Sequence, residues 1–340
     1  MNRRLVPDRR SGQSPMSMAS EGPVAAMAPI TGQLEMISVV VPCFRSQGTL
    51  EALCDRVQAA MRELGRPYEL VLIEDCGGDR TWDVILQLQR TRENVRGIRL
   101  ARNYGQHNAL LAGIFSARGA WVVTIDDDLQ NPPEEIGRLL AKVNEGFDVV
   151  YGKPSRQQHG LMRNLASSVT KLVLKGAMGA EVASHVSAFR IFRTELREAF
   201  SDYRGPIVNI DVLLTWGTRR YATTEVSQNE RTVGESGYTL GKLVAHAMNM
   251  MTGFSVLPLQ LAAMAGFLFA TFGFGLLCYV VIRFVISGSP VPGFPFLASI
   301  VSMFSGIQLF ALGIIGEYIA RIHLRSTRQP PFVVAERAGL

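Results

Sequence analysis

At residues 121–130 the sequence reads WVVTIDDDLQ, an apolar run of strand type that ends directly in three aspartates, a leucine and a glutamine. Open α/β sheets bind ligands outside the carboxyl ends of their strands, so this acidic run stands where a ligand would be held. Clustered carboxylates repel one another, and a hard divalent cation with oxygen ligands is the simplest compensation. Residues 131–135, NPPEE, also suit the first turn of a helix, so a helix-capping role for the acidic run stays open at this point.

Short β-branched runs alternate with helical patterns around this stretch, which predicts βαβ units and a largely parallel sheet. The expected strands are residues 37–41, 69–74, 95–100, 121–125 and 148–152. The expected helices are residues 49–64, 82–92, 108–118 and 133–145. Polar clusters follow nearly every strand, so we expect them to converge on one crevice. The glycine-rich fingerprints of dinucleotide dehydrogenases and P-loop NTPases are absent from the sequence, which disfavours both classes.

Two apolar stretches near the C-terminus, residues 257–286 and 296–320, are each long enough to cross a bilayer as a helix, which takes about 20 residues. No charged side chain lies between Lys242 and Arg283, or between Arg283 and Glu317. Buried helices of a soluble core are the alternative, and the lack of a charged face disfavours it. The flanks are basic and the connection is uncharged, so the positive-inside rule places both ends in the cytoplasm.

The net charge of +6 comes without a basic patch interleaved with aromatic residues, so we expect attraction to an anionic membrane surface and no nucleic-acid partner. The four cysteines show no paired metal spacing and are expected as reduced thiols. Residues 1–35 lack sustained periodicity and are expected to be a disordered arm. Small faces on the first apolar stretch are compatible with a homo-oligomer, and they are formed by Gly266, Gly273 and Gly275.

Several segments together resemble a known family. They are VVVPCF (39–44), IEDCGGDRTW (73–82), LARNYGQHNALLAG (100–113), DDDLQNPPE (126–134), HVSAFRIFR (185–193), VNIDVLLTWGTRR (208–220) and NERTVGESGYTLGKL (229–243). The chain resembles the membrane-bound polyprenyl-phosphate glycosyltransferases of glycosyltransferase family 2. The resemblance is nearest to the bacterial undecaprenyl-phosphate aminoarabinose and glucosyl transferase group.

The resemblance implies a GT-A fold, an α/β domain with a mostly parallel sheet, followed by a transmembrane hairpin of two helices. The catalytic domain would then span residues 36–235. A juxtamembrane amphipathic segment would span 236–256, and the hairpin would be followed by a cytoplasmic tail at 321–340. The resemblance further implies the bacterial inner membrane, crossed more than once, with the catalytic domain and both termini in the cytoplasm.

The resemblance also implies roles for individual residues. A Mg²⁺ or Mn²⁺ ion would be held by Asp126, Asp128 and Gln130, with Asp127 in a tolerant middle position. The catalytic residues would be Asp126, Asp128 and Arg231. The donor would be bound by Pro42, Asp75, Asp79, Arg102, Asn103, Asp126 and Gln130. The acceptor would be bound by Arg190, Asp211, Arg231 and Ser236.

Two acceptor-side residues have ordinary structural alternatives. Arg190 could form a structural ion pair, and Asp211 could cap a helix. The chain also departs from the family pattern at residues 44–46, where Phe-Arg-Ser stands in place of Tyr-Asn-Glu. Some relatives carry an aspartate, proposed as a base, at the position of Ala188.

The activity implied by the resemblance is the inverting transfer of one sugar from a nucleotide-sugar to a polyprenyl phosphate, with undecaprenyl phosphate expected, at the cytoplasmic membrane face. A processive polysaccharide synthase is an alternative, but the Gln-x-x-Arg-Trp segment of such enzymes is missing. A non-catalytic membrane scaffold is a second alternative, and it would have no need of carboxylates at this spacing.

A pH profile follows from the missing aspartate at position 188. A phosphate monoester loses its second proton at a pH of about 6, so the acceptor is mostly a dianion at neutral pH and needs no general base. We therefore expect the transfer rate to fall as the pH drops through about 6. A flat profile down to about pH 5, measured where chemistry limits the rate, would contradict this expectation.

Overall fold

The structure is a computed structural model, and it describes residues 35–154, 186–205, 208–229, 256–287 and 294–339. Several expectations fall on other residues. Nearly all of the N-terminal arm and of the segment 236–256, together with Arg231 and Ser236, lie outside the described residues.

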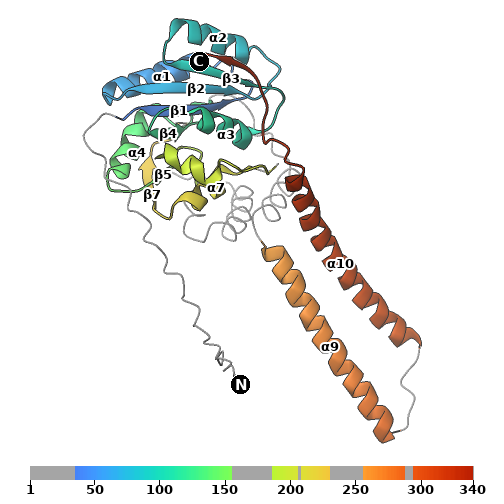
Figure 1. Cartoon of the computed structure of the whole chain (residues 1–340). Coiled ribbons are helices and arrows are strands. Elements are labelled where there is room, and N and C mark those ends of the chain that lie inside the picture. The colour runs from blue at the N-terminus through green and yellow to red at the C-terminus, as the bar shows by residue number, and fades with distance from the viewer. Residues whose placement is uncertain (1–34, 155–185, 206–207, 230–255, 288–293, 340) are drawn as a thin grey trace, which may run out of the picture. The chain divides into compact units, whose positions relative to one another are not determined.

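An eight-stranded sheet carries the α/β domain, in the order β7-β5-β6-β4-β1-β2-β3-β8 (Figure 1). Its strands are β1 Ile37–Cys43, β2 Tyr68–Glu74, β3 Val95–Leu100, β4 Trp121–Thr124, β5 Val149–Pro154, β6 Arg190–Arg193, β7 Tyr221–Val226 and β8 Val334–Ala338. The pairs β1–β2, β1–β4, β2–β3 and β5–β7 are parallel. β6 and β8 run antiparallel to their neighbours, so the sheet is mixed and mostly parallel, as expected.

Helices pack against this sheet and bury its central strands. They are α1 Leu50–Glu63, α2 Thr81–Thr91, α3 Gln106–Ser116, α4 Ile136–Val143 and α7 Ile210–Gly217, with short 3-10 turns η1 Pro133–Glu135 and η2 Thr194–Phe200. Every residue of β1 is buried, which explains why its sequence is apolar except for Ser38. Gly113 brings α3 close to the sheet, because a Cβ there would lie 2.4 Å from a methyl of Val40.

Three strands were not expected from the sequence. β6 has only four residues and begins and ends with arginine, and β7 is polar and half-exposed. β8 lies within residues 321–340, which were expected only as a tail. The structure corrects that expectation: α10 Phe294–Ser326 takes up the start of this segment, and β8 pairs antiparallel with β3. β8 carries two adjacent charged residues, Glu336 and Arg337, as an edge strand that is held mainly by backbone pairing can.

The two apolar stretches form the helices α9 Leu257–Ser287 and α10, which extend the expected bounds. Spans of 29 and 24 residues within them are long and apolar enough to cross a membrane, and their most apolar stretches are not buried inside the protein. The helices pack on each other through Phe269 and Phe304, whose rings meet edge to face at 6.2 Å. Gly273 also faces Phe304, whereas a Cβ added at Gly266 or Gly275 would meet nothing within 4 Å.

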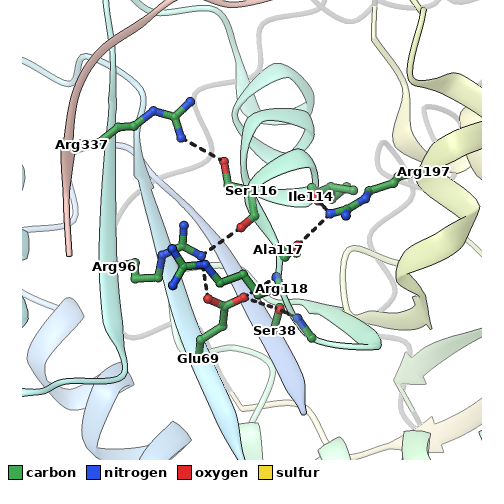
Figure 2. A network of polar contacts seen from close by, with 10 residues as sticks. Ser38, Glu69, Arg96, Ile114, Ser116, Ala117, Arg118, Arg197 and Arg337 are labelled. Carbon is green, nitrogen blue, oxygen red and sulfur yellow. Dashed lines mark hydrogen bonds and ion pairs between the residues drawn. The ribbon is translucent and has the colours of Figure 1, made fainter. Parts of the chain in front are cut away.

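A buried charge network lies at the end of α3, away from the carboxyl ends of the parallel strands (Figure 2). Glu69 accepts hydrogen bonds from the Ser38 hydroxyl and the Arg118 N–H, both at 2.6 Å, and forms an ion pair of 2.6 Å with Arg96. Burial raises the pKa of Glu69, but these hydrogen bonds and the charge of Arg96 lower it more, so the net shift is downward. Arg96 also donates to the carbonyl of Ser116, which ties the sheet to the C-terminus of α3.

We expect Glu69→Gln to lower the free energy of unfolding by about 3 kcal/mol, because it leaves the buried Arg96 without a counter-charge. The folded pKa of Glu69 is depressed, so its stabilisation is present above the unfolded pKa of about 4.3 and is lost as the pH falls through the folded pKa. Thermal unfolding in detergent measures the loss. Asp55→Asn, which removes the exposed partner of Arg92, is the matched control and should change stability by less than about 1 kcal/mol.

Candidate active site

The loops that follow β1, β2, β3 and β4 are tied together by side-chain contacts at the carboxyl ends of these parallel strands. Asp126 accepts a hydrogen bond from Gln106 Nε2, at the start of α3, at 2.7 Å. Asp127 accepts from the Phe44 N–H at 3.2 Å and from the hydroxyl of Ser46. The acidic run therefore connects the loop after β4 to the loops after β1 and β3, as a strand-end crevice requires.

Asp127 belongs to a longer chain of hydrogen bonds. Ser46, which binds Asp127 through its hydroxyl, donates its backbone N–H to Thr81 Oγ1 at 2.9 Å. The hydroxyl of Thr81 donates in turn to Asp79 at 2.9 Å. Asp79, expected at the donor, thus orders the start of α2. Asp127, expected to be the tolerant middle residue, is the member of the acidic run that holds the first loop in place.

Asp128 makes a different kind of contact. Its carboxylate accepts from the Gln130 N–H at 3.1 Å, which is its one hydrogen bond within the described residues. Leu129 between them has a φ of 59°, a left-handed conformation that non-glycine residues adopt at a cost. The turn is further held by Asn229, whose N–H donates to the Gln130 carbonyl at 2.8 Å. This turn presents Asp128 with spare acceptor capacity, as a cation ligand needs.

Asp75 links the loops after β2 and β3. Its two carboxylate oxygens accept from the backbone N–H groups of Tyr104 and Gly105, at 2.7 and 2.8 Å. Its own N–H donates to the Cys43 carbonyl at 3.0 Å. Burial raises the pKa of Asp75, although the two backbone hydrogen bonds oppose that shift. The resemblance implies Asp75 as a donor-binding residue, and the structure shows it joining three strand ends.

The acidic run is electrostatically strained. Burial raises the pKa of Asp126 to about 6, and the charges of Asp128 and Asp127 add to the shift. Burial also raises the pKa of Asp127, against the hydrogen bonds from Ser46 and Phe44. A cation placed beside these carboxylates would relieve the repulsion. The helix-capping alternative has no support, because the following turn begins at Pro133 without a side-chain cap.

The donor set fits a divalent ion that is shared with a phosphate ligand. The described residues contain no group of three or more acidic, histidine or cysteine side chains that could hold a metal by themselves. Mg²⁺ usually binds one or two protein carboxylates and takes its remaining ligands from water and substrate phosphates. Two carboxylates under mutual repulsion, at a turn with spare acceptor oxygens, match that pattern.

Arg190 and Asp211, expected on the acceptor side, are buried and form an ion pair with each other. Arg190 also donates to the Thr124 hydroxyl at 3.0 Å, directly before the acidic run. The hydroxyl of Tyr151, also buried, has no hydrogen-bond partner within the described residues. Asp211 does not cap α7, because Asn209 does so by accepting from the N–H of Val212. Arg190 therefore forms a structural ion pair, which was the alternative to acceptor binding. Its hydrogen bond to Thr124 connects this ion pair to the strand that leads into the acidic run.

The other residues expected to bind the nucleotide-sugar are either exposed or buried at the end of a strand. Pro42 is buried at the end of β1. Arg102 and Asn103 are exposed, and the guanidinium of Arg102 lies 4.7 Å from the ring centre of Tyr104. Both are therefore accessible to a ligand.

Three residues at the centre of these contacts were missed by sequence reasoning. They are Ser46, Thr81 and Gln106. Ser and Thr directly after a strand or before a helix resemble ordinary turn and cap residues, so their position alone gives no signal. The connection of these three residues to the acidic run becomes visible only when the folded structure brings the loops together.

We expect Asp211→Asn to destabilise the protein by about 3 kcal/mol, because Arg190 would remain buried without a counter-charge. Thermal unfolding in detergent measures this. This expectation would be contradicted if the unfolding midpoint stayed unchanged while transfer activity disappeared. That outcome would instead indicate that Asp211 binds the acceptor. Glu225→Gln, an exposed change on β7, is the control.

The chain is similar to known proteins of one family. Residues 38–199 match the family model described as glycosyl transferase family 2. The undecaprenyl-phosphate 4-deoxy-4-formamido-L-arabinose transferase of Photorhabdus laumondii is 31% identical over 310 residues, covering 90% of this chain and 95% of that protein. The protein of the same name from Pseudomonas aeruginosa is 33% identical over 310 residues, covering 88% and 90%.

Among solved structures, glucosyl-3-phosphoglycerate synthase of Mycobacterium tuberculosis is 18% identical, with a TM-score of 0.48 over 64% of this chain and 78% of that one. The expected family is confirmed by the family model and by two relatives that are 31% and 33% identical along most of their length. The chain belongs to glycosyltransferase family 2, with a GT-A domain followed by two apolar helices, and it is a glycosyltransferase.

Proposed function

We propose that this protein transfers a single sugar from a nucleotide-sugar to undecaprenyl phosphate, with inversion at the sugar carbon that reacts, on the cytoplasmic side of a bacterial inner membrane. The observation that carries the proposal is the acidic run at the carboxyl end of β4, joined to the loops after β1 and β3. The names of the relatives supply the acceptor class, since they are transferases that act with undecaprenyl phosphate.

The donor occupies the strand-end crevice in this proposal. Asp126, Asp128 and Gln130 would hold a divalent ion, Mg²⁺ or Mn²⁺, which would supply positive charge to stabilise the departing nucleoside diphosphate. Asp75 and Asp79 shape the loop for the nucleoside. Arg102 and Asn103 are exposed beside that loop and are available to the donor's polar groups. The carboxylates of the acidic run repel one another and would also repel a diphosphate that arrived alone. Binding of a cation together with the diphosphate is therefore favoured.

The acceptor arrives from the membrane in this proposal. Two helices long and apolar enough to span a bilayer follow the catalytic domain, and they keep the protein where polyprenyl tails reside. Asn229, hydrogen-bonded to Gln130, lies two residues before Arg231 in the chain. We place Arg231 and Ser236 at the acceptor phosphate, because a guanidinium fork suits phosphate oxygens.

The proposed chemistry is a single displacement. An oxygen of the acceptor phosphate forms the new bond to the sugar carbon from one face, while the bond to the nucleoside diphosphate breaks on the other face. The attacking phosphate is a dianion and has no proton to lose, so no base is required at position 188. The carbonyl of Ala188 instead accepts a hydrogen bond from the Thr124 hydroxyl at 2.7 Å, which keeps this segment against β4.

The test uses purified protein in detergent with undecaprenyl phosphate and a panel of nucleotide-sugars. Mass spectrometry of the lipid should reveal one added sugar, and it identifies both the sugar and the base that are accepted. No modified lipid with any donor in the panel would overturn the proposal.

We expect Asp128→Asn to lower the transfer rate on the order of 100-fold, or about 2.7 kcal/mol, because one carboxylate ligand of the ion is lost. Chelation of divalent ions should abolish the wild-type activity, and added Mg²⁺ or Mn²⁺ should restore it. Glu134→Gln, which removes a nearby carboxylate paired with Arg56, is the control and should retain near-normal activity. Wild-type transfer by Asp128→Asn would contradict the metal assignment.

A further inference from the structure

We propose that Glu336, on the strand that follows the second apolar helix, is a positioning residue for the nucleotide-sugar donor. It would act through Arg99 and Glu74 on the loop of residues 74–80, and this part of the inference rests on the proposed function. The donor loop, as we call residues 74–80, runs from the end of β2 to the start of α2 and contains Asp75 and Asp79.

Glu336 is linked to both flanks of the donor loop, directly to Trp82 on α2 and through Arg99 to Glu74 on β2. Its Oε1 lies 3.0 Å from Arg99 on β3, in an ion pair, and Arg99 Nε lies 3.3 Å from Glu74 Oε2 at the end of β2. Its Oε2 accepts from Trp82 Nε1, at the start of α2, at 3.0 Å. Arg99 and Glu336 are directly opposed in the β3–β8 register, so strand pairing brings the two charges together.

Glu74 connects the contacts of Glu336 and Arg99 to the backbone of the donor loop. The residue is 3% exposed, and its Oε1 accepts from the Gly77 N–H inside the donor loop at 2.7 Å. Its Oε2 has no hydrogen-bond partner within the described residues, so the charge of Arg99 is the compensation that the structure provides. A buried carboxylate that lost this compensation would be costly to keep in place.

Arg99 needs a second anchor to provide that compensation. Its side chain is 40% exposed, so it can exchange the contact with Glu74 for water. Glu336 fixes the guanidinium from the outer side at 3.0 Å. Without the charge of Glu336, Glu74 would be the one ion-pair partner left to Arg99 among the described residues, at the longer distance of 3.3 Å and with Arg99 partly exposed.

The donor loop has a backbone that requires such support. Cys76 has a φ of 54°, a left-handed conformation that costs a non-glycine residue energy, and Gly78 has a φ of 74°, which glycine adopts freely. At Gly77 a Cβ would lie 2.8 Å from the backbone nitrogen of Arg45, so the loop is pressed against the turn after β1. Uncommon backbone conformations of this kind persist when the surroundings over-determine them. The contacts of Glu336, near the C-terminus, are part of the surroundings that hold the donor loop in this conformation.

A consequence is that donor binding depends on chain that comes after the second apolar helix. We expect Glu336→Gln to raise the KM for the nucleotide-sugar about tenfold, with kcat and the KM for undecaprenyl phosphate changed less than about twofold. Glutamine can still accept from Trp82 but carries no charge for Arg99. The matched control is Arg337→Gln on the same strand, whose one side-chain contact among the described residues is a hydrogen bond of 3.5 Å to Ser116 (Figure 2). This variant should leave all three constants unchanged.

Hydrogen–deuterium exchange of the full chain in detergent gives a readout that does not require turnover. Glu336→Gln should speed exchange in the donor loop while residues 136–143 of α4 keep their wild-type rates, and Arg337→Gln should match the wild type. Unchanged exchange in the donor loop would overturn the inference. So would equal effects of the two variants, or a loss of kcat and of affinity for both substrates together.

The two proposals fail in different ways. If the wild-type protein transfers no sugar to undecaprenyl phosphate, the proposed function fails, and the exchange rates still decide whether Glu336 orders the loop. If transfer is observed and the donor KM of Glu336→Gln equals that of the wild type, the positioning role fails while the proposed function stands.

Discussion

Repulsion among the carboxylates at the end of β4 is the constraint on which the rest of the site depends. Parallel strands bring several polar loops to one edge, and the acidic run is half-buried there, so its charges are poorly screened. The protein offsets the cost with specific hydrogen bonds to Asp126 and Asp127 and with the buried Arg190 behind them. Asp128 keeps spare acceptor capacity, so the repulsion that remains would favour the binding of a cation.

The supporting contacts reach further than the acidic run itself. Asp127, Ser46, Thr81 and Asp79 form one chain across three loops, so the loops after β1, β2 and β4 depend on one another. At the opposite end of α3, a second buried charge network around Glu69 fixes the helix against β1 and β2. The helix that begins beside Asp126 is therefore held at both ends, which favours a site organised before ligand arrives.

The C-terminal chain joins the two parts of the protein. A hairpin of apolar helices is followed by β8, which adds a strand to the edge of the sheet and places Glu336 beside Arg99. Strand pairing of this kind links the end of α10 to the domain through backbone hydrogen bonds, which depend little on side-chain identity. Backbone pairing with β3 explains how β8, which has little apolar character, can still have a defined position in the sheet.

The sequence by itself determined the family, the five parallel strands, the apolar hairpin and the identity of the acidic run. These features rest on local patterns, since buried strands and spanning helices need apolar residues and the motifs are contiguous. Tertiary structure alone decided the strands β6, β7 and β8, the pairing of Arg190 with Asp211 and the bridging role of Asp127. Each of these depends on partners far apart in the chain, and their contact energies appear only after the sheet has brought the strand ends together.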